Sequence, residues 1–179
     1  MRQLKPIVCL ILTIALYPAI GQKLVSERGQ ISFFSDATLE DIQAVNKKAV
    51  SILNLATGDI GFSVQIKEFK FDQSLMEEHF NEKYMNAETY PRSTFQGKVT
   101  GFSPTAAGVQ TVSAAGKLTI HGVTRDVDIP GTLENQAGKW QLKSKFKIRI
   151  KDYKIEIPQL LWEKVAEEVE ITVDFVYHP

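Results

Sequence analysis

The chain has 179 residues, and its 21 Lys and Arg side chains equal its 21 Asp and Glu side chains in number. This balance gives no basis for nucleic-acid binding, which needs a dense basic surface. The length suits one domain of ordinary size, and Cys9 is the only cysteine.

Residues 1–21 predict a cleaved secretory signal. Arg2 and Lys5 precede an apolar run, and cleavage after Gly21 would give a single mature domain at 22–179. The run is shorter than the ~20 residues of a transmembrane helix, and a retained N-terminal anchor is the alternative. Cleavage would remove the cysteine, leaving no disulfide, thiol nucleophile or thiolate metal site. We expect a periplasmic or secreted protein.

The first part of the mature chain gives one weak helical signal and one clear strand. Leu39–Ala44 predicts a short helix. Asp59–Gln65 alternates apolar and polar residues, which is typical of a strand with one buried face. The apolar parity then changes before Phe69 and Phe71, which predicts a bulge or bend.

A short helix is predicted from about Gln73 to Met85. Ser74 and Glu77 fit a capping box, and apolar residues within Leu75–Phe80 fall at helical spacing. The apolar face of such a helix could cover one end of a barrel.

The rest of the chain reads mainly as strands. They include Phe95–Gly101, Val112–Ile120, Lys139–Ile150 and Val169–Tyr177, with a helix predicted at Gln159–Ala166. About eight strands joined mostly by turns predict an all-β domain with short helices, either a sandwich or an up-and-down barrel.

Small residues fall on the apolar faces of two predicted strands. Gly97 and Gly101 share the parity of Phe95, while Ala114 and Gly116 share that of Leu118. They leave room in a barrel lumen for a ligand, or they relieve strain where strands bend. The sequence leaves both interpretations open.

One hairpin carries the most specific pattern of the chain. Gly116–Val127 reads GKLTIHGVTRDV, with its turn at His121 and Gly122. The His121 ring is placed to bond to backbone. The segment resembles the "LTIHGVT(K/R)" hairpin of the YceI-like family.

Further segments resemble that family in the same order, from about Gly29 to Tyr177. They are Glu77–Phe80, Met85–Pro91 with Ser93–Phe95, and Ile148–Arg149 with Asp152–Tyr153. The chain departs from the family at Lys151, usually serine, at Lys154, usually glycine, and in a longer Pro158–Glu167.

The resemblance implies a single antiparallel lipocalin-like β-barrel. It also implies an apolar lumen for a long-chain lipid such as a polyisoprenoid or an isoprenoid quinone, and leaves open whether the protein forms a homodimer.

Twelve apolar residues are candidates for the lumen wall, because alternation turns them to the inner face. They are Phe62, Val64, Phe95, Val99, Leu118, Trp140, Leu142, Phe146, Ile148, Ile171, Val173 and Phe175. They would line a cavity for an alkyl or prenyl chain, or they would pack tightly against each other.

Five polar residues are candidates for the cavity mouth or a lipid head group: His79, Tyr84, Tyr90, Arg149 and Tyr153. His79 could instead be an ordinary helix residue. Arg149 shares the parity of outward-facing lysines, and only a bulge would turn it inward.

No catalytic or metal-binding pattern stands out. The spacing of His79, His121 and His178 fits no zinc or iron motif, and the chain has no nucleophile elbow, phosphate loop or dinucleotide fingerprint. We therefore expect a non-enzymatic binding protein without cofactors. An enzyme using the same cavity, and a packed barrel acting as an interaction module, are the alternatives.

Overall fold

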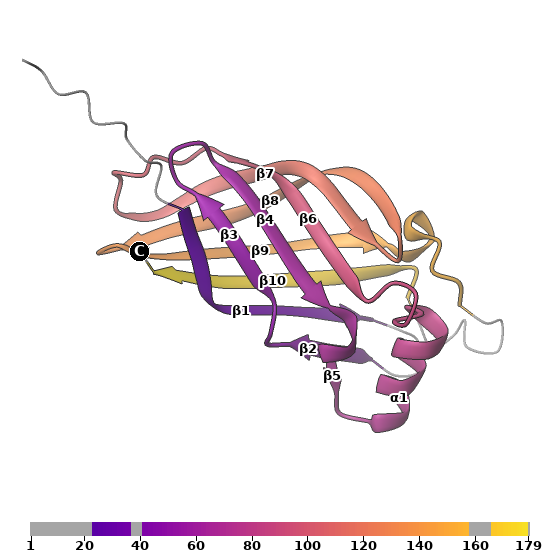
Figure 1. Ribbon diagram of the computed structural model, residues 1–179. Helices are drawn as coiled ribbons and strands as arrows, with labels where there is room; N and C mark the ends of the chain where they lie inside the picture. Colours follow the sequence, from indigo (N-terminus) through magenta and orange to yellow (C-terminus); the bar gives the residue numbers. More distant parts are fainter. Residues whose placement is uncertain (1–22, 37–40, 158–165, 179) are drawn as a thin grey trace, which may run out of the picture.

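The computed structural model describes residues 23–36, 41–157 and 166–178. Its chain is mostly antiparallel β-strand (Figure 1). The strands are β1 (Lys23–Ser35), β2 (Ile42–Asn46), β3 (Val50–Asn54), β4 (Asp59–Gln65), β5 (Lys70–Phe71), β6 (Arg92–Thr100), β7 (Gly108–Ile120), β8 (Val123–Gln136), β9 (Lys139–Arg149) and β10 (Glu168–His178). The predicted signal at 1–21, and residues 159–165 of the helix predicted at Gln159–Ala166, lie outside the described residues.

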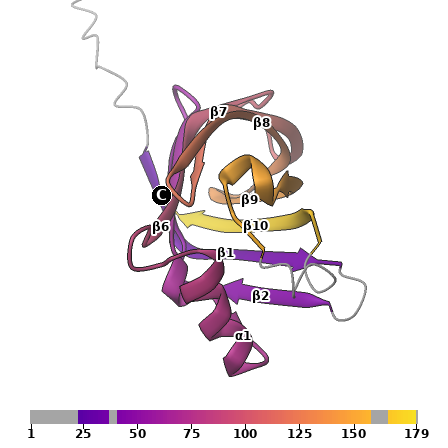
Figure 2. The same cartoon turned by 90° about the vertical axis from the view of Figure 1, so that its right-hand side faces the viewer.

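The sheet closes on itself. Its strands follow the order β10-β9-β8-β7-β6-β4-β3-β1, and β1 pairs with β10 from Val25 to Phe34. These eight strands form a closed antiparallel barrel, which confirms the predicted fold class. Seen from the end in Figure 2, β7 and β8 arch over β10 and β1. Closure leaves few unpaired strand edges.

Two bends widen one end of the barrel. Asn46 holds the bend between β2 and β3: its Nδ2 donates to the Gln65 carbonyl over 2.8 Å, and its Oδ1 accepts the Lys48 N–H over 2.8 Å. At the same level β4 passes into a 3₁₀ turn over Ile66–Glu68 before β5 begins. β2 and β5 pair with each other and extend the wall beyond β1.

One local prediction is confirmed here and one is wrong. The parity change before Phe69 was expected to mark a bulge or a bend, and it is a bend, made by the 3₁₀ turn. The helix predicted at Leu39–Ala44 is contradicted from Ile42 onward, because Ile42–Asn46 is β2, with buried Ile42 and Ala44 on either side of exposed Gln43. So short an apolar segment does not distinguish strand from helix.

β8 and β9 pair over only part of their length. From their hairpin the pairing extends to Gly131 and Ser144, and beyond these residues the two strands separate. Pro130 is the next residue of β8 and has no N–H to donate to β9, while its carbonyl accepts the Ser144 hydroxyl over 2.6 Å. A 3₁₀ turn over Ile150–Tyr153 follows β9 and lies beneath the β7–β8 arch (Figure 2).

One short helix, α1 (Ser74–His79), continues as a π-helical turn over Phe80–Tyr84. This confirms the helix predicted within Gln73–Met85. The predicted capping box is wrong, because Gln73 is the N-cap residue and the helix has no side-chain cap hydrogen bond. No α1 residue is buried, so the helix lies on the end of the barrel and not in its core.

The other end of the barrel is filled by side chains. Tyr177 is 0% exposed, and its hydroxyl lies 2.7 Å from Ser51 Oγ. Because Ser51 donates its single hydroxyl hydrogen to the Gly61 carbonyl over 3.0 Å, Tyr177 is the donor in the pair. Leu53 and Leu133 are equally inaccessible.

Candidate functional site

A cavity of about 150 Å³ lies at the wide end of the barrel, next to α1. Its walls come from β1, β2, β4, β6, β7, β9 and β10, from β5 with its preceding 3₁₀ turn, and from α1 with its π turn. An engineered cavity of about this volume holds a benzene molecule. The space therefore fits a small part of a long lipid.

The described wall of the cavity is almost wholly apolar. Among the lining residues, only Ser35, Ser93 and Tyr84 carry a side-chain oxygen or nitrogen. The Tyr84 hydroxyl is neutral at physiological pH, and burial raises its pKa further above the usual value near 10. The wall thus offers hydrocarbon contact and no charge, which suits an apolar chain.

Four phenylalanines fix the helix to the barrel wall. The Phe80 ring of the π turn lies 5.3 Å from Phe33, 5.6 Å from Phe69 and 5.1 Å from Phe71, measured between ring centroids. Such pairs contribute about 0.5–1.5 kcal/mol each beyond area burial. All four rings also line the cavity.

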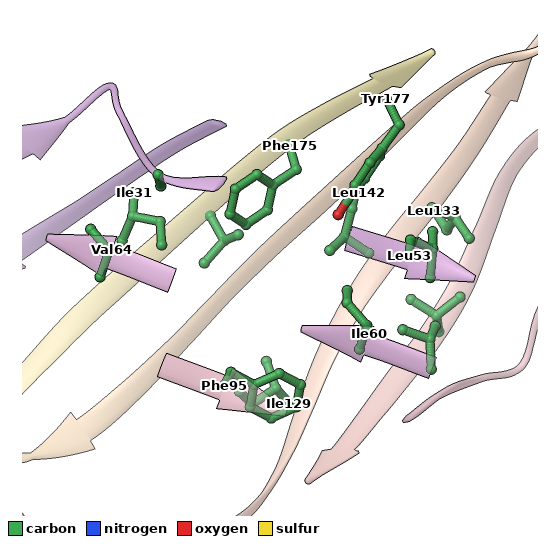
Figure 3. Packing of buried hydrophobic residues seen from close by; sticks show 14 of the residues in the cluster. Ile31, Leu53, Ile60, Val64, Phe95, Ile129, Leu133, Leu142, Phe175 and Tyr177 are labelled. Atoms are coloured by element: carbon green, nitrogen blue, oxygen red, sulfur yellow. The ribbon is translucent and has the colours of Figure 1, made fainter. Parts of the chain in front are cut away.

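A second aromatic group separates the cavity from the packed half of the barrel. Phe62 stacks on Phe95, with centroids 5.2 Å apart, and lies 6.0 Å from Phe175. Phe62 lines the cavity, whereas Phe95 and Phe175 do not. In the view of Figure 3, Phe175 lies between Ile31, which lines the cavity, and Tyr177, which does not.

The predicted lumen residues all belong to the barrel's main apolar cluster. Seven line the cavity: Phe62, Val64, Leu118, Phe146, Ile148, Ile171 and Val173. The other five lie in the packed part: Phe95, Val99, Trp140, Leu142 and Phe175. Alternation predicts which face a residue takes but not at which level the interior is hollow. Ligand contact stays a prediction for all twelve.

The small residues do not enlarge the cavity. A Cβ on Gly97 would come within 2.7 Å of the Phe95 ring, and a Cβ on Gly116 would lie 2.9 Å from the Gln96 carbonyl carbon. Gly101 follows β6 with φ +88°. Gly97 and Gly116 therefore permit close approach of rings and backbones, and Gly101 permits a turn. Ala114 does not line the cavity.

Of the predicted mouth residues, only Tyr84 lines the cavity. His79 Nε2 lies 3.2 Å from Lys83 Nζ on the helix surface. Arg149 is exposed and lies 3.8 Å from Glu168, in keeping with the outward face that its alternation favours.

Tyr90 and Tyr153 belong instead to a contact around the hairpin turn. The Tyr90 ring packs edge-on against His121, with centroids 4.6 Å apart. Tyr153 is 3% exposed and lies in the main apolar cluster, so it does not stand on an open rim. Burial, and after it the charge of Asp152, raises the pKa of its hydroxyl.

The β7–β8 hairpin holds the turn that follows β9. His121 Nδ1 donates to the Tyr153 carbonyl over 3.2 Å, as the hairpin histidine was predicted to bond to backbone. Arg125 Nε donates to the Asp152 carbonyl over 3.0 Å. The hairpin is thereby tied to Ile150–Tyr153 at the end where β8 and β9 have separated.

The sequence analysis did not predict several residues that line the cavity. Phe33, Phe69, Phe71 and Phe80 line the cavity, although none was a candidate. The sequence feature that could have identified them is the cluster of phenylalanines on either side of the predicted helix. Ile150 also lines the cavity, from the turn after β9.

The described residues form neither a metal site nor a membrane-spanning helix. Within 23–36, 41–157 and 166–178, no three His, Cys, Asp or Glu side chains are grouped so that they could hold a metal ion. In the same part of the chain, no helix is long and apolar enough to span a bilayer.

The family is decided by the match of one domain model. The YceI-like domain matches residues 23–177, which include all ten strands apart from the last residue of β10. The chain belongs to the YceI-like family. Among curated proteins, none has a sequence significantly similar to it.

Solved structures share the fold at low identity. A polyisoprenoid binding domain from Saccharophagus degradans is 15% identical, with a TM-score of 0.76, over 87% of this chain and 97% of that one. BcnA of Burkholderia cenocepacia is 20% identical, with a TM-score of 0.69, over 83% and 95%. The YCEI protein of Campylobacter jejuni is 16% identical, with a TM-score of 0.57, over 74% and 81%.

Proposed function

We propose that this YceI-like protein holds the apolar chain of an isoprenoid lipid in its barrel, as a non-enzymatic carrier or sequestering protein. The observation that carries the proposal is the cavity, whose described wall is uncharged and almost wholly apolar. The polyisoprenoid-binding name of the Saccharophagus degradans domain adds support. Each buried methylene would contribute about 0.8 kcal/mol to binding.

The size of the cavity shapes the proposal. At about 150 Å³ it takes the end of a polyisoprenoid or of an isoprenoid quinone tail, and the remainder of the chain extends past α1. Met76, Phe80 and Tyr84 of α1 and its π turn line the cavity and would contact the part of the chain held there.

The alternative functions find less support. An enzyme would need titratable side chains gathered in the cavity. The titratable side chains of His79, His121, Asp152 and Glu156 do not line its wall. A packed interaction module would have no internal cavity.

The compartment is part of the proposal. A signal at residues 1–21 would deliver the domain to the periplasm or the exterior, where an apolar lipid needs a carrier to cross water.

A pair of tryptophan variants tests the proposal. Ile171 faces the cavity, whereas its neighbour Thr172 is exposed on the outer face of β10. Delipidated wild-type protein should bind geranylgeraniol, and Ile171→Trp should weaken binding at least about tenfold, the equivalent of ~1.4 kcal/mol. Thr172→Trp should bind as wild type does. Equal binding by both folded variants would contradict a site in this cavity.

A further inference from the structure

We propose that Phe62, Phe95 and Phe175 form a floor that limits how much of an apolar chain the barrel accepts. This inference rests on the proposed function and adds to it the feature that selects chain length. Phe62 and Phe95 are cross-strand partners on the neighbouring strands β4 and β6, and Phe175 comes from β10, which pairs with neither of these strands.

The boundary lies at one level on separate strands. On β10, Val173 lines the cavity and Phe175, the next inward residue, does not. On β6 the boundary falls between Ser93 and Phe95. On β4 it falls just below Phe62. Because the Phe175 ring of β10 lies 6.0 Å from Phe62, the boundary shared by β10 and the β4–β6 pair is a layer across the lumen and not a local constriction.

Glycines hold two of the rings in place. The Phe95 ring lies over Gly97, where an added Cβ would come within 2.7 Å of Cζ. The Phe175 ring lies over Gly29, its cross-strand partner, where an added Cβ would come within 2.6 Å of Cε1. Any larger residue at these glycines would collide with the rings, so the glycines leave room for the rings in the positions that they occupy.

Little space remains beneath the floor. Tyr177, Leu53 and Leu133 are each 0% exposed there. The end of a bound chain would therefore meet Phe62, and each further carbon would stay on the α1 side, in poorer contact with the wall. Affinity should rise with chain length only until the cavity is full.

Three variants separate the floor from general stability. Phe62→Leu keeps an apolar residue and deepens the cavity. Val64→Phe puts a ring one inward position nearer the mouth on the same strand and makes the cavity shallower. Phe102→Leu is the matched control, because it removes the same atoms as Phe62→Leu. Phe102 packs on Trp140, and neither residue lines the cavity. Thermal unfolding establishes that each variant is folded.

The measurement is the affinity of each protein for straight-chain primary alcohols from hexanol to eicosanol. In wild type we expect about fourfold tighter binding per added methylene up to a break length, and little gain beyond it. The break should move to longer alcohols in Phe62→Leu and to shorter ones in Val64→Phe. It should stay in place in Phe102→Leu.

The outcomes that contradict the two proposals differ. If wild type binds none of the alcohols, the proposed function itself is wrong. If it binds them but shows no break, or if the break is the same in folded Phe62→Leu and Val64→Phe, the barrel has no floor at this layer and only the inference is overturned.

Discussion

Lys154 occupies a backbone conformation that favours glycine. Its φ is +53°, at the end of the turn Ile150–Tyr153, where the family usually has glycine. A residue with a side chain costs about 1–2 kcal/mol in the left-handed region, and glycine avoids this cost. Glycine loses more conformational freedom on folding, which offsets part of the gain. We expect Lys154→Gly to raise the free energy of unfolding by about 0.5–1 kcal/mol in urea titrations. A destabilised variant would contradict this account of the turn.

The buried pair Tyr177 and Ser51 gives an asymmetric prediction. Ser51→Ala leaves the Tyr177 hydroxyl as a buried donor without its partner, and should cost about 2 kcal/mol. Tyr177→Phe leaves Ser51 still donating to the Gly61 carbonyl, and should cost about 1 kcal/mol. Urea unfolding at neutral pH measures both. A larger loss in Tyr177→Phe than in Ser51→Ala would show that the hydrogen-bond direction is wrong.

For single residues, the sequence predicts well whether a side chain points into the barrel, but it does not predict at which level along the barrel the side chain lies. The alternation of β9 places Ile148 inward and Arg149 outward, as the structure has them. Nothing in the period of two tells Phe146, which lines the cavity, from Leu142, which does not. That difference arises where rings from other strands cross the lumen, and it depends on pairing that one sequence does not reveal.

Among the elements, the β7–β8 hairpin has a role that its motif does not show. Its His121 and Arg125 hold the turn after β9, where β8 and β9 no longer pair. The motif therefore helps to close this end of the barrel, because His121 and Arg125 donate hydrogen bonds to two backbone carbonyls of the turn.

Loss of Arg125 should loosen that turn. The Lys154 and Ile155 amides donate to Lys151 and Ile150 within it. In Arg125→Ala we expect these two amides to exchange hydrogen about fivefold faster, the equivalent of one hydrogen bond of ~1 kcal/mol. Lys117→Ala, which breaks only the exposed ion pair with Asp126 on the same hairpin, should leave them unchanged. Unaltered exchange in Arg125→Ala would show that the turn is held by packing alone.

Elements with a clear period were predictable, and those without one were not. The strand at Lys139–Ile150 was found because its alternation continues along its whole length. The helix within Gln73–Met85 was found from the helical spacing of the apolar residues within Leu75–Phe80, although α1 has only six residues. β2 has five residues, and it was taken for part of a helix. The bend before β5 is fixed by Asn46 and by a 3₁₀ turn, and neither leaves a periodic signal.

For the whole molecule, buried tyrosines should make stability fall in alkali. Burial raises the pKa of Tyr177, Tyr153 and Tyr84 above their usual value near 10. The unfolded chain therefore loses these protons first, so their contribution is complete below about pH 10 and is lost as pH rises through the folded-state pKa values. Urea midpoints at pH 8 to 11 measure the loss.

Tyr177→Phe serves as the control for this pH dependence. It removes the most buried of the three hydroxyls, so its midpoint should fall less between pH 9 and 11 than that of wild type. An equal fall in both proteins would assign the alkaline loss to other groups.

The central claim concerns what the whole barrel carries. Native mass spectrometry of the protein purified from a double-membrane bacterium, followed by solvent extraction, tests it most directly. We predict one added mass per chain that extracts as an isoprenoid lipid. A bare mass that stays unchanged after incubation with geranylgeraniol and with an isoprenoid quinone would contradict the carrier function.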